Sequence, residues 1–125
     1  MSISKPTNAE LVILRVLWER GASTVRDVFE VLSKTQGSGY TTVLKFMQIM
    51  YKKGLVTRDS STKAHVYKAA VTEDEAQQGI VKDLLDGTFQ GSAQKLVLSA
   101  LSMKTSTPEE LAEIRRLIDQ LEKEQ

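Results

Sequence analysis

The sequence predicts a mainly α-helical protein with one small β-hairpin, on three observations. The pattern Thr-x-x-acid occurs four times just ahead of a segment with apolar residues at helical spacing, which is typical of the capping box that begins a helix. Over residues 55–68 the apolar period changes to two, which is typical of strands. The chain has 125 residues, 41% hydrophobic and 26% charged, enough to bury a core. The four helix starts are Thr7/Glu10, Thr24/Asp27, Thr72/Glu75 and Thr107/Glu110.

Two helices are expected at the N-terminus. The first, over residues 8–19, follows Thr7 and ends at Gly21, which can adopt the left-handed turn of a helix end. A shorter helix over residues 25–33 follows Thr24. Both have apolar residues at helical spacing, so each predicts one buried face.

A third helix is expected over residues 40–53, after the turn QGSG. Ser38 can cap its start, and Gly54 stands just past its last turn. At about 3.6 residues per turn, one side of this helix is an apolar stripe that would pack on the first two helices. The stripe consists of Val43, Met47 and Met50, with Leu44 and Tyr51 beside it.

A β-hairpin follows the third helix. Its expected strands, 55–59 and 64–68, flank the turn-rich segment 60–63. Three short helices followed by a hairpin form the outline of a winged helix, a helix-turn-helix variant whose hairpin is the wing. We therefore expect a winged-helix domain over residues 1–71.

Residues 72–125 are predicted to form a helical dimerisation region. A helix from about residue 72 ends near Gly91, an apolar piece spans 96–101, and the last helix begins with Pro108 at its first position. Apolar residues at coiled-coil-like spacing on a short helix with acidic flanks need a partner surface, and a second copy of the chain is the commonest one. The candidate dimerisation residues are Ile80, Leu84, Leu98, Leu101, Leu111, Ile114, Leu117, Ile118 and Leu121.

Charge divides the chain into two parts. Residues 1–70 hold 11 Lys+Arg and 5 Asp+Glu, a balance of +6, whereas residues 71–125 hold 6 and 11, a balance of −5. This asymmetry suggests an anionic partner for the first part and another task for the second. The alternative is that the charges only solvate two surfaces.

Several classes of protein are disfavoured. No apolar run approaches the roughly 20 residues that span a bilayer, and the start MSISKPTNAE lacks the apolar core of a signal peptide. Cysteine is absent, which excludes disulfides and thiolate sites and fits a cytoplasmic protein. The single histidine, His65, is expected to be a strand residue, and no glycine-rich phosphate loop is present. We expect no enzyme activity, catalytic residue, metal site or cofactor.

The outward side of the third helix suits DNA. Hydroxyls and an amide can contact base edges, and lysines can contact phosphates or guanine acceptors. Thr41 and Thr42 are the candidates for base edges, followed by Gln48, and the cations should mainly contact phosphates. The alternative is a solvated face with a threonine-rich cap. The candidate DNA-binding residues are Ser38, Tyr40, Thr41, Thr42, Lys45, Gln48, Lys52, Lys53, Arg58 and Lys63.

Residues 6–72 resemble the penicillinase-repressor family of bacterial transcription repressors, of the BlaI, MecI and CopY type; beyond residue 72 the resemblance is mainly one of helix pattern. The matching motifs are Pro6-Thr7, Glu10-Leu11, Ile13-Leu14, Leu17-Trp18, Thr24-Val25-Arg26-Asp27-Val28, Tyr40-Thr41-Thr42-Val43, Lys53-Gly54-Leu55-Val56 and His65-Val66-Tyr67. This resemblance implies a homodimer that binds an inverted-repeat DNA operator and blocks transcription. Implied targets are β-lactamase, methicillin-resistance or copper-homeostasis genes, and in the β-lactam systems a membrane metalloprotease sensor leads to repressor cleavage.

The chain also departs from the family pattern. Ile49 stands where many relatives have arginine, and Lys45 and Phe46 replace a threonine and an aliphatic residue, so the operator sequence is expected to differ. The segment 96–100 lacks the Asn-Phe pair of the cleavage site, and the cysteine motifs of copper-responsive members are absent. The rival interpretation is a winged helix that binds only an acidic protein.

Overall fold

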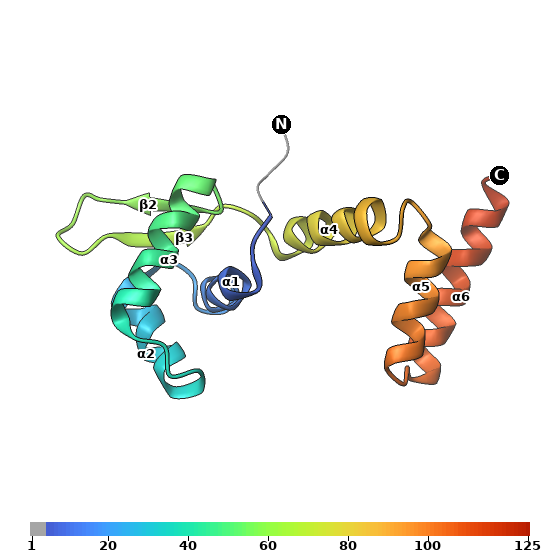
Figure 1. Cartoon of the computed structure of the whole chain (residues 1–125), viewed down its shortest axis with the longest axis horizontal. Coiled ribbons are helices and arrows are strands. Elements are labelled where there is room, and N and C mark those ends of the chain that lie inside the picture. The colour runs from blue at the N-terminus through green and yellow to red at the C-terminus, as the bar shows by residue number, and fades with distance from the viewer. Residues whose placement is uncertain (1–4) are drawn as a thin grey trace. The chain divides into compact units, whose positions relative to one another are not determined.

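The computed structural model describes residues 5–125 and has the expected helices and hairpin strands, with one further strand, β1 (Figure 1). Residues 1–4 of the expected first domain lie outside the described part. The elements are α1 (Asn8–Arg20), β1 (Ser23–Thr24), α2 (Val25–Thr35), α3 (Tyr40–Lys53), β2 (Val56–Asp59), β3 (Val66–Ala69), α4 (Glu73–Asp83), η1 (Leu84–Thr88), α5 (Ala93–Met103) and α6 (Pro108–Lys123).

Local signals set the helix starts. At α1, the Thr7 N–H donates to Glu10 Oε1 at 2.9 Å, and the Glu10 N–H donates to Thr7 Oγ1 at 3.2 Å. These two bonds satisfy backbone donors that a helix start leaves free. The same reciprocal bonds form at Thr24/Asp27, Thr72/Glu75 and Thr107/Glu110.

The hairpin belongs to a three-stranded antiparallel sheet in the order β1-β3-β2. The two-residue strand β1 pairs Thr24 with Val66, and β2 pairs Arg58 with Tyr67. The sequence did not predict β1, because two residues are too few to show a strand period. Since Thr24 also caps α2, the start of α2 is attached directly to the wing.

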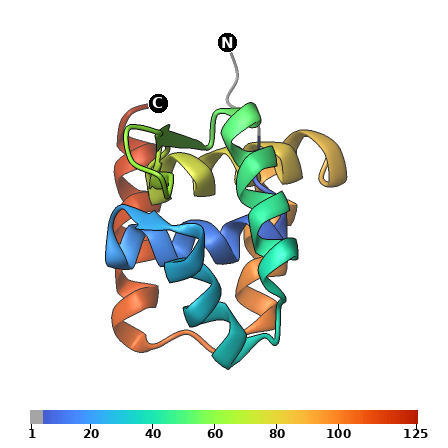
Figure 2. The same cartoon turned by 90° about the vertical axis from the view of Figure 1, so that its left-hand side faces the viewer.

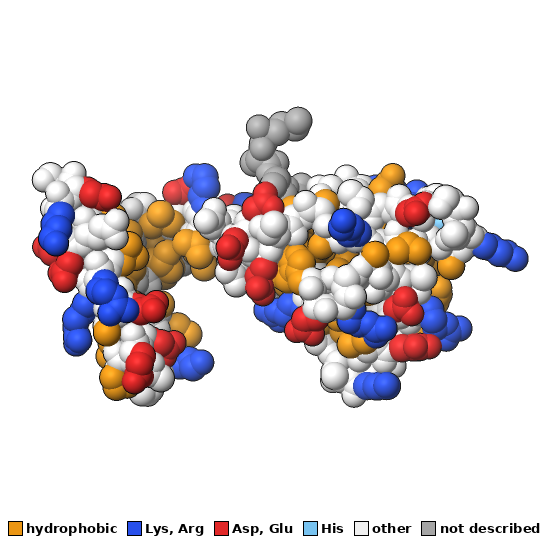
Figure 3. Space-filling model, turned by 180° about the vertical axis from the view of Figure 1, so that it is seen from behind, with side chains coloured by type: hydrophobic (Ala, Val, Ile, Leu, Met, Phe, Trp, Pro, Cys, Tyr) orange, Lys and Arg blue, Asp and Glu red, His pale blue; other side chains and the backbone are white. Residues whose placement is uncertain are grey.

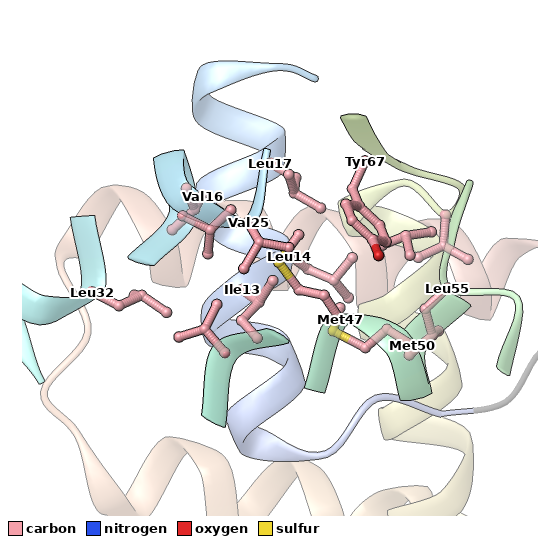
Figure 4. Packing of buried hydrophobic residues seen from close by; sticks show 14 residues of the cluster. Ile13, Leu14, Val16, Leu17, Val25, Leu32, Met47, Met50, Leu55 and Tyr67 are labelled. Atoms are coloured by element: carbon pink, nitrogen blue, oxygen red, sulfur yellow. The ribbon is translucent and has the colours of Figure 1, made fainter. Parts of the chain in front are cut away.

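A single aliphatic core joins α1, α2, α3 and the sheet (Figure 4). Met47, Met50 and Tyr67 from α3 and β3 lie against Ile13 and Leu14 from α1. Other members are Val16, Leu17, Val25, Val28, Leu32, Val43, Leu55, Val56 and Val71. The winged helix predicted from the sequence is confirmed.

Contacts divide the chain into two compact units, one up to Lys82 and one from Asp83 onward. The predicted domain boundary at 71/72 precedes α4, whereas this division follows most of it. The difference arises because Val71, just before α4, and Ala76, within α4, are buried within the first unit. Val71 is also fixed there by its carbonyl, which accepts from Trp18 Nε1 at 2.9 Å.

The expected helix that ends near Gly91 is present, but its last turn is π-helical. After Asp83 the chain enters η1, a π-helical turn in which the Phe89 N–H donates to the Leu84 carbonyl at 2.9 Å. Gly87 lies within this turn, and glycine weakens a regular helix. The prediction that this segment is helical and ends near Gly91 is therefore confirmed, and the π-helical last turn is the feature that the sequence did not predict.

Candidate nucleic-acid interface

Helix α3 has the two sides that the sequence predicted. Val43, Met47 and Met50 are buried against α1 and α2, so the helix cannot rotate without opening the core. The predicted outward residues Thr41, Thr42, Lys45, Gln48 and Lys52 are all exposed. Polar side chains with hydroxyl, amide and ammonium groups are thus held on a rigid element.

The end of α3 leads directly into the wing. Gly54 has φ 84° and ψ 11°, the left-handed conformation that glycine adopts without strain. The next N–H, of Leu55, donates to the Met50 carbonyl at 3.0 Å, and the Leu55 side chain is buried. This closure positions β2 against α3; Figure 2 shows the two elements from a second direction.

The tip of the wing is an ordered loop bearing Lys63. The Ser61 N–H donates to Asp59 Oδ1 at 2.9 Å, and the Thr62 hydroxyl donates to the Ala64 carbonyl at 2.6 Å. Hydrogen bonds from Ser61 lower the pKa of Asp59 below its ordinary value. The loop therefore has internal structure that holds the exposed Lys63 near its tip.

A groove of about 310 Å³ lies between α3, the start of α2 and the wing. Its lining includes three cationic side chains, one histidine and no carboxylate. Arg58 Nε is buried and has no hydrogen-bond partner among the described residues. The groove thus has a positively charged lining, which suits an anionic oxygen. Its polar lining includes Arg26, Tyr40, Gln48, Arg58, Lys63 and His65.

Two arginines of this groove lie over tyrosines. The Arg58 guanidinium carbon is 4.1 Å from the centroid of the Tyr51 ring, and that of Arg26 is 5.6 Å from the Tyr40 ring. Phe29 meets Tyr40 edge to face at 5.7 Å. These cation–π contacts attach the wing and α2 to opposite ends of α3.

Two candidate residues have other roles in the structure. Gly39, rather than Ser38, is the residue at the N-cap of α3, and no side chain caps this helix. Lys53 Nζ donates to Glu10 Oε1 at 2.6 Å, and its side chain is only 27% exposed. The cap predicted at Ser38 was wrong, and the geometry of Lys53 is that of an ion pair with α1.

Sequence reasoning missed Arg26 and placed no function on His65. Arg26 stands in the first turn of α2, where a cation is unfavourable to the helix dipole. The positive charge of Arg26 at this position could have indicated, from the sequence alone, an interaction outside α2. His65 precedes β3 and lines the groove, so it lies beside the strand in which it was expected.

The candidate dimerisation residues lie on two different parts of the chain. No described residue of α5 or α6 is buried, although both helices contain aliphatic residues at helical spacing. Figure 3 shows hydrophobic side chains at the surface of this part of the chain. Leu111 and Ile114 are half-buried, and the others on these helices are exposed: Leu98, Leu101, Leu117, Ile118 and Leu121.

Ile80 and Leu84 lie elsewhere. Ile80 is half-buried and lines a hollow between α1 and α4 together with Leu11 and Trp18. Leu84 is the first residue of η1 and is exposed. The structure therefore does not place these two residues on α5 or α6.

No helix of residues 5–125 is both long and apolar enough to cross a bilayer. Within the same residues, no three acidic or histidine side chains gather into a group that could hold a metal ion.

Comparison with known proteins gives the family. The family model described as penicillinase repressor matches residues 6–120. The chain belongs to the penicillinase-repressor family. This match spans both the winged helix and the C-terminal helices, so the family resemblance of the motifs is confirmed.

Relatives within the penicillinase-repressor family cover nearly the whole chain. Transcriptional regulator BlaI of Mycobacterium tuberculosis is 31% identical over 114 residues, which are 90% of this chain and 82% of that protein. Methicillin resistance regulatory protein MecI of Staphylococcus aureus is 20% identical over 113 residues, 90% of this chain and 92% of that protein.

Solved structures agree with the winged helix. The solution structure of the DNA-binding domain of the repressor BlaI has a TM-score of 0.53 and 25% identity, and the match covers 58% of this chain and 89% of that one. Monomeric BlaI of Bacillus licheniformis in complex with the blaP half-operator has a TM-score of 0.52, with the same identity and coverage.

Proposed function

We propose that this chain is a transcriptional repressor that binds a palindromic DNA operator as a homodimer. The observation that carries this proposal is α3, whose buried stripe fixes a row of exposed hydroxyl, amide and ammonium groups. A helix of this kind inserts into the major groove, and a wing beside it lies along the backbone.

Each part of the interface has a distinct role in this proposal. Thr41 and Thr42 meet base edges, with Gln48 as a further candidate. Lys45, Lys52 and Lys63 neutralise phosphates. Tyr40 is the first residue of α3, Arg26 of α2 lies over its ring, and Ser38 precedes α3 as a minor candidate. We leave Lys53 out because its ammonium pairs with Glu10.

Arg58 is proposed to meet a phosphate in the groove between α3 and the wing. Its side chain lines the groove, where the guanidinium can donate to a phosphate oxygen. Stacking on Tyr51 already fixes the side chain, so little conformational freedom is lost on binding.

Dimerisation is proposed through α5 and α6. A unit without buried residues gains little from the hydrophobic effect by itself, and a second copy would cover its exposed leucines and isoleucines. Two-fold symmetry of the dimer then matches a palindromic operator.

The family suggests finer features that belong to the same proposal. These are control of β-lactamase-type resistance or stress genes, a cytoplasmic location, and a membrane metalloprotease sensor as a further partner. The segment 96–100 lies inside α5, so a protease would need this helix to open.

A mobility-shift experiment with genomic fragments at two salt concentrations tests the proposal. We expect sequence-selective retention that weakens at higher salt, because phosphate contacts release counterions. Retention that is equal for all fragments would contradict a sequence-specific repressor. No retention at either salt would favour the protein-interaction module.

A further inference from the structure

One flank of α3 is apolar, in contrast to the cationic groove on the wing side. Phe46 and Ile49 line a hollow on the exposed side of the helix together with Thr41, Thr42 and Lys45. Ile49 is 38% exposed and Phe46 is half-buried. Spacings of four and three residues make Thr42, Phe46 and Ile49 neighbours on the helix surface.

This flank belongs to the surface proposed to enter the major groove. Lys45 is the residue one turn before Ile49, and both line the same hollow. A base edge placed against Ile49 and Phe46 receives no hydrogen bond from them. Guanine, adenine and cytosine present donors or acceptors and no methyl group, so they would leave polar groups unpaired there without an apolar contact in return.

The C5-methyl of thymine is the one apolar group that base edges present in the major groove. It is small enough to enter a hollow between two apolar side chains. The methyl group of Thr42 extends the same surface. The chemistry of this flank therefore selects a methylated pyrimidine.

We infer that Ile49, supported by Phe46, is a specificity-determining residue that contacts a thymine methyl in each half of the operator. This inference rests on the proposed function and deepens it, because it names the base that one side of α3 recognises. The inference does not concern the operator base pairs that face Thr41, Gln48 or the wing.

The test begins with selection of binding sites for the full chain from random duplex DNA. In the selected site, each thymine of one half is replaced in turn by deoxyuridine, which lacks only the methyl group, and Kd is measured by fluorescence anisotropy. At one position we expect binding to weaken about fourfold, the effect of removing one buried methyl group from an apolar contact. Ile49→Ala should bind the thymine and deoxyuridine duplexes equally at that position.

Two controls make the result specific. Val81→Ala removes an aliphatic side chain that is 49% exposed on α4, and it should keep the fourfold difference. At the same position, 5-methylcytosine should bind the wild-type chain more tightly than cytosine, and Ile49→Ala should not distinguish them.

The failures are distinguishable. A pool without enrichment overturns the proposed function and this inference with it. An enriched site at which no deoxyuridine weakens binding, or at which Ile49→Ala keeps the full difference, overturns the inference alone.

Discussion

At the scale of single residues, the ion pair of Glu10 and Lys53 gives one lysine of α3 a structural role. The Glu10 side chain is only 3% exposed. Burial raises the pKa of Glu10, but the Lys53 hydrogen bond, the Thr7 N–H and the lysine charge together lower it below the ordinary value of 4.5. The carboxylate is therefore stabilised in the folded chain and joins the start of α1 to the end of α3.

This pair predicts a pH-dependent stability. Because the folded pKa lies below the unfolded value, the carboxylate stabilises the fold above about pH 4.5, and this contribution is lost as the pH falls through the folded pKa. Glu10→Gln should lower the free energy of unfolding by about 1–3 kcal/mol at pH 7. Urea unfolding at pH 7 and at lower pH should show the difference from wild type narrowing in acid. Glu19→Gln, an exposed change on the same helix, is the control, and a constant difference at all pH values would contradict the assignment.

The exposed position of Lys63 at the wing tip leads to a prediction about the salt dependence of DNA binding. Lys63→Ala should weaken DNA binding on all sequences and reduce the slope of log K against log salt by about 0.9, the share of one phosphate. Anisotropy titrations at several salt concentrations measure this slope. Lys123→Ala, in α6, should leave it unchanged. An unchanged slope for Lys63→Ala would remove that residue from the contacts.

At the scale of elements, Thr24 connects α2 with the wing. Its hydroxyl accepts from the Asp27 N–H at 3.1 Å, and its backbone pairs with Val66 in β3. The start of α2 places Arg26 at the groove. One residue therefore links a helix start, a strand pair and the position of a cation.

Loss of this cap should destabilise the winged helix. Thr24→Ala should cost about 1 kcal/mol of unfolding free energy, because the first turn of α2 loses an acceptor. Thr24→Ser retains the hydroxyl and should lose much less. Denaturant unfolding of both variants checks the expectation; equal losses would show that the methyl group, and not the cap, is responsible.

At the scale of the whole molecule, the two compact units differ in how they are stabilised. The first has a continuous core, whereas α5 and α6 contain no buried residue. This absence of a core in α5 and α6 supports the proposal that they associate with a second copy. In the proposed homodimer, dimerisation and DNA binding are linked, because a dimer would contact both halves of a palindrome at once.

Ile118→Asp tests this dependence. Ile118 is 49% exposed on α6, and a carboxylate there would be buried without a partner in a dimer. We expect sedimentation velocity to show monomers, and affinity for a full operator to fall much more than affinity for a half-site. Gln120→Asp adds the same charge on the opposite side of α6 and should remain dimeric. An intact Ile118→Asp dimer would exclude this surface.

The sequence by itself determined the features that depend on near neighbours. Helix starts follow from Thr-x-x-acid pairs, the end of α3 follows from Gly54, and the buried stripe of α3 follows from its helical period. The outward position of Lys45 and Gln48 follows from the same period. Each of these rests on hydrogen bonds or spacings within a few residues, so a single chain segment contains the information.

Only the tertiary structure decided what distant segments do to one another. Lys53 pairs with Glu10, a residue 43 positions away in the sequence. Helical spacing alone therefore could not show that Lys53 and Lys52 have different roles. The strand β1 exists through its pairing with β3, and Arg26 joins Arg58 because α2 packs beside the wing. The apolar hollow at Ile49 likewise depends on α3 being held with that flank uncovered. Packing selects, from the residues that face outward, those whose charges and donors remain available to a partner.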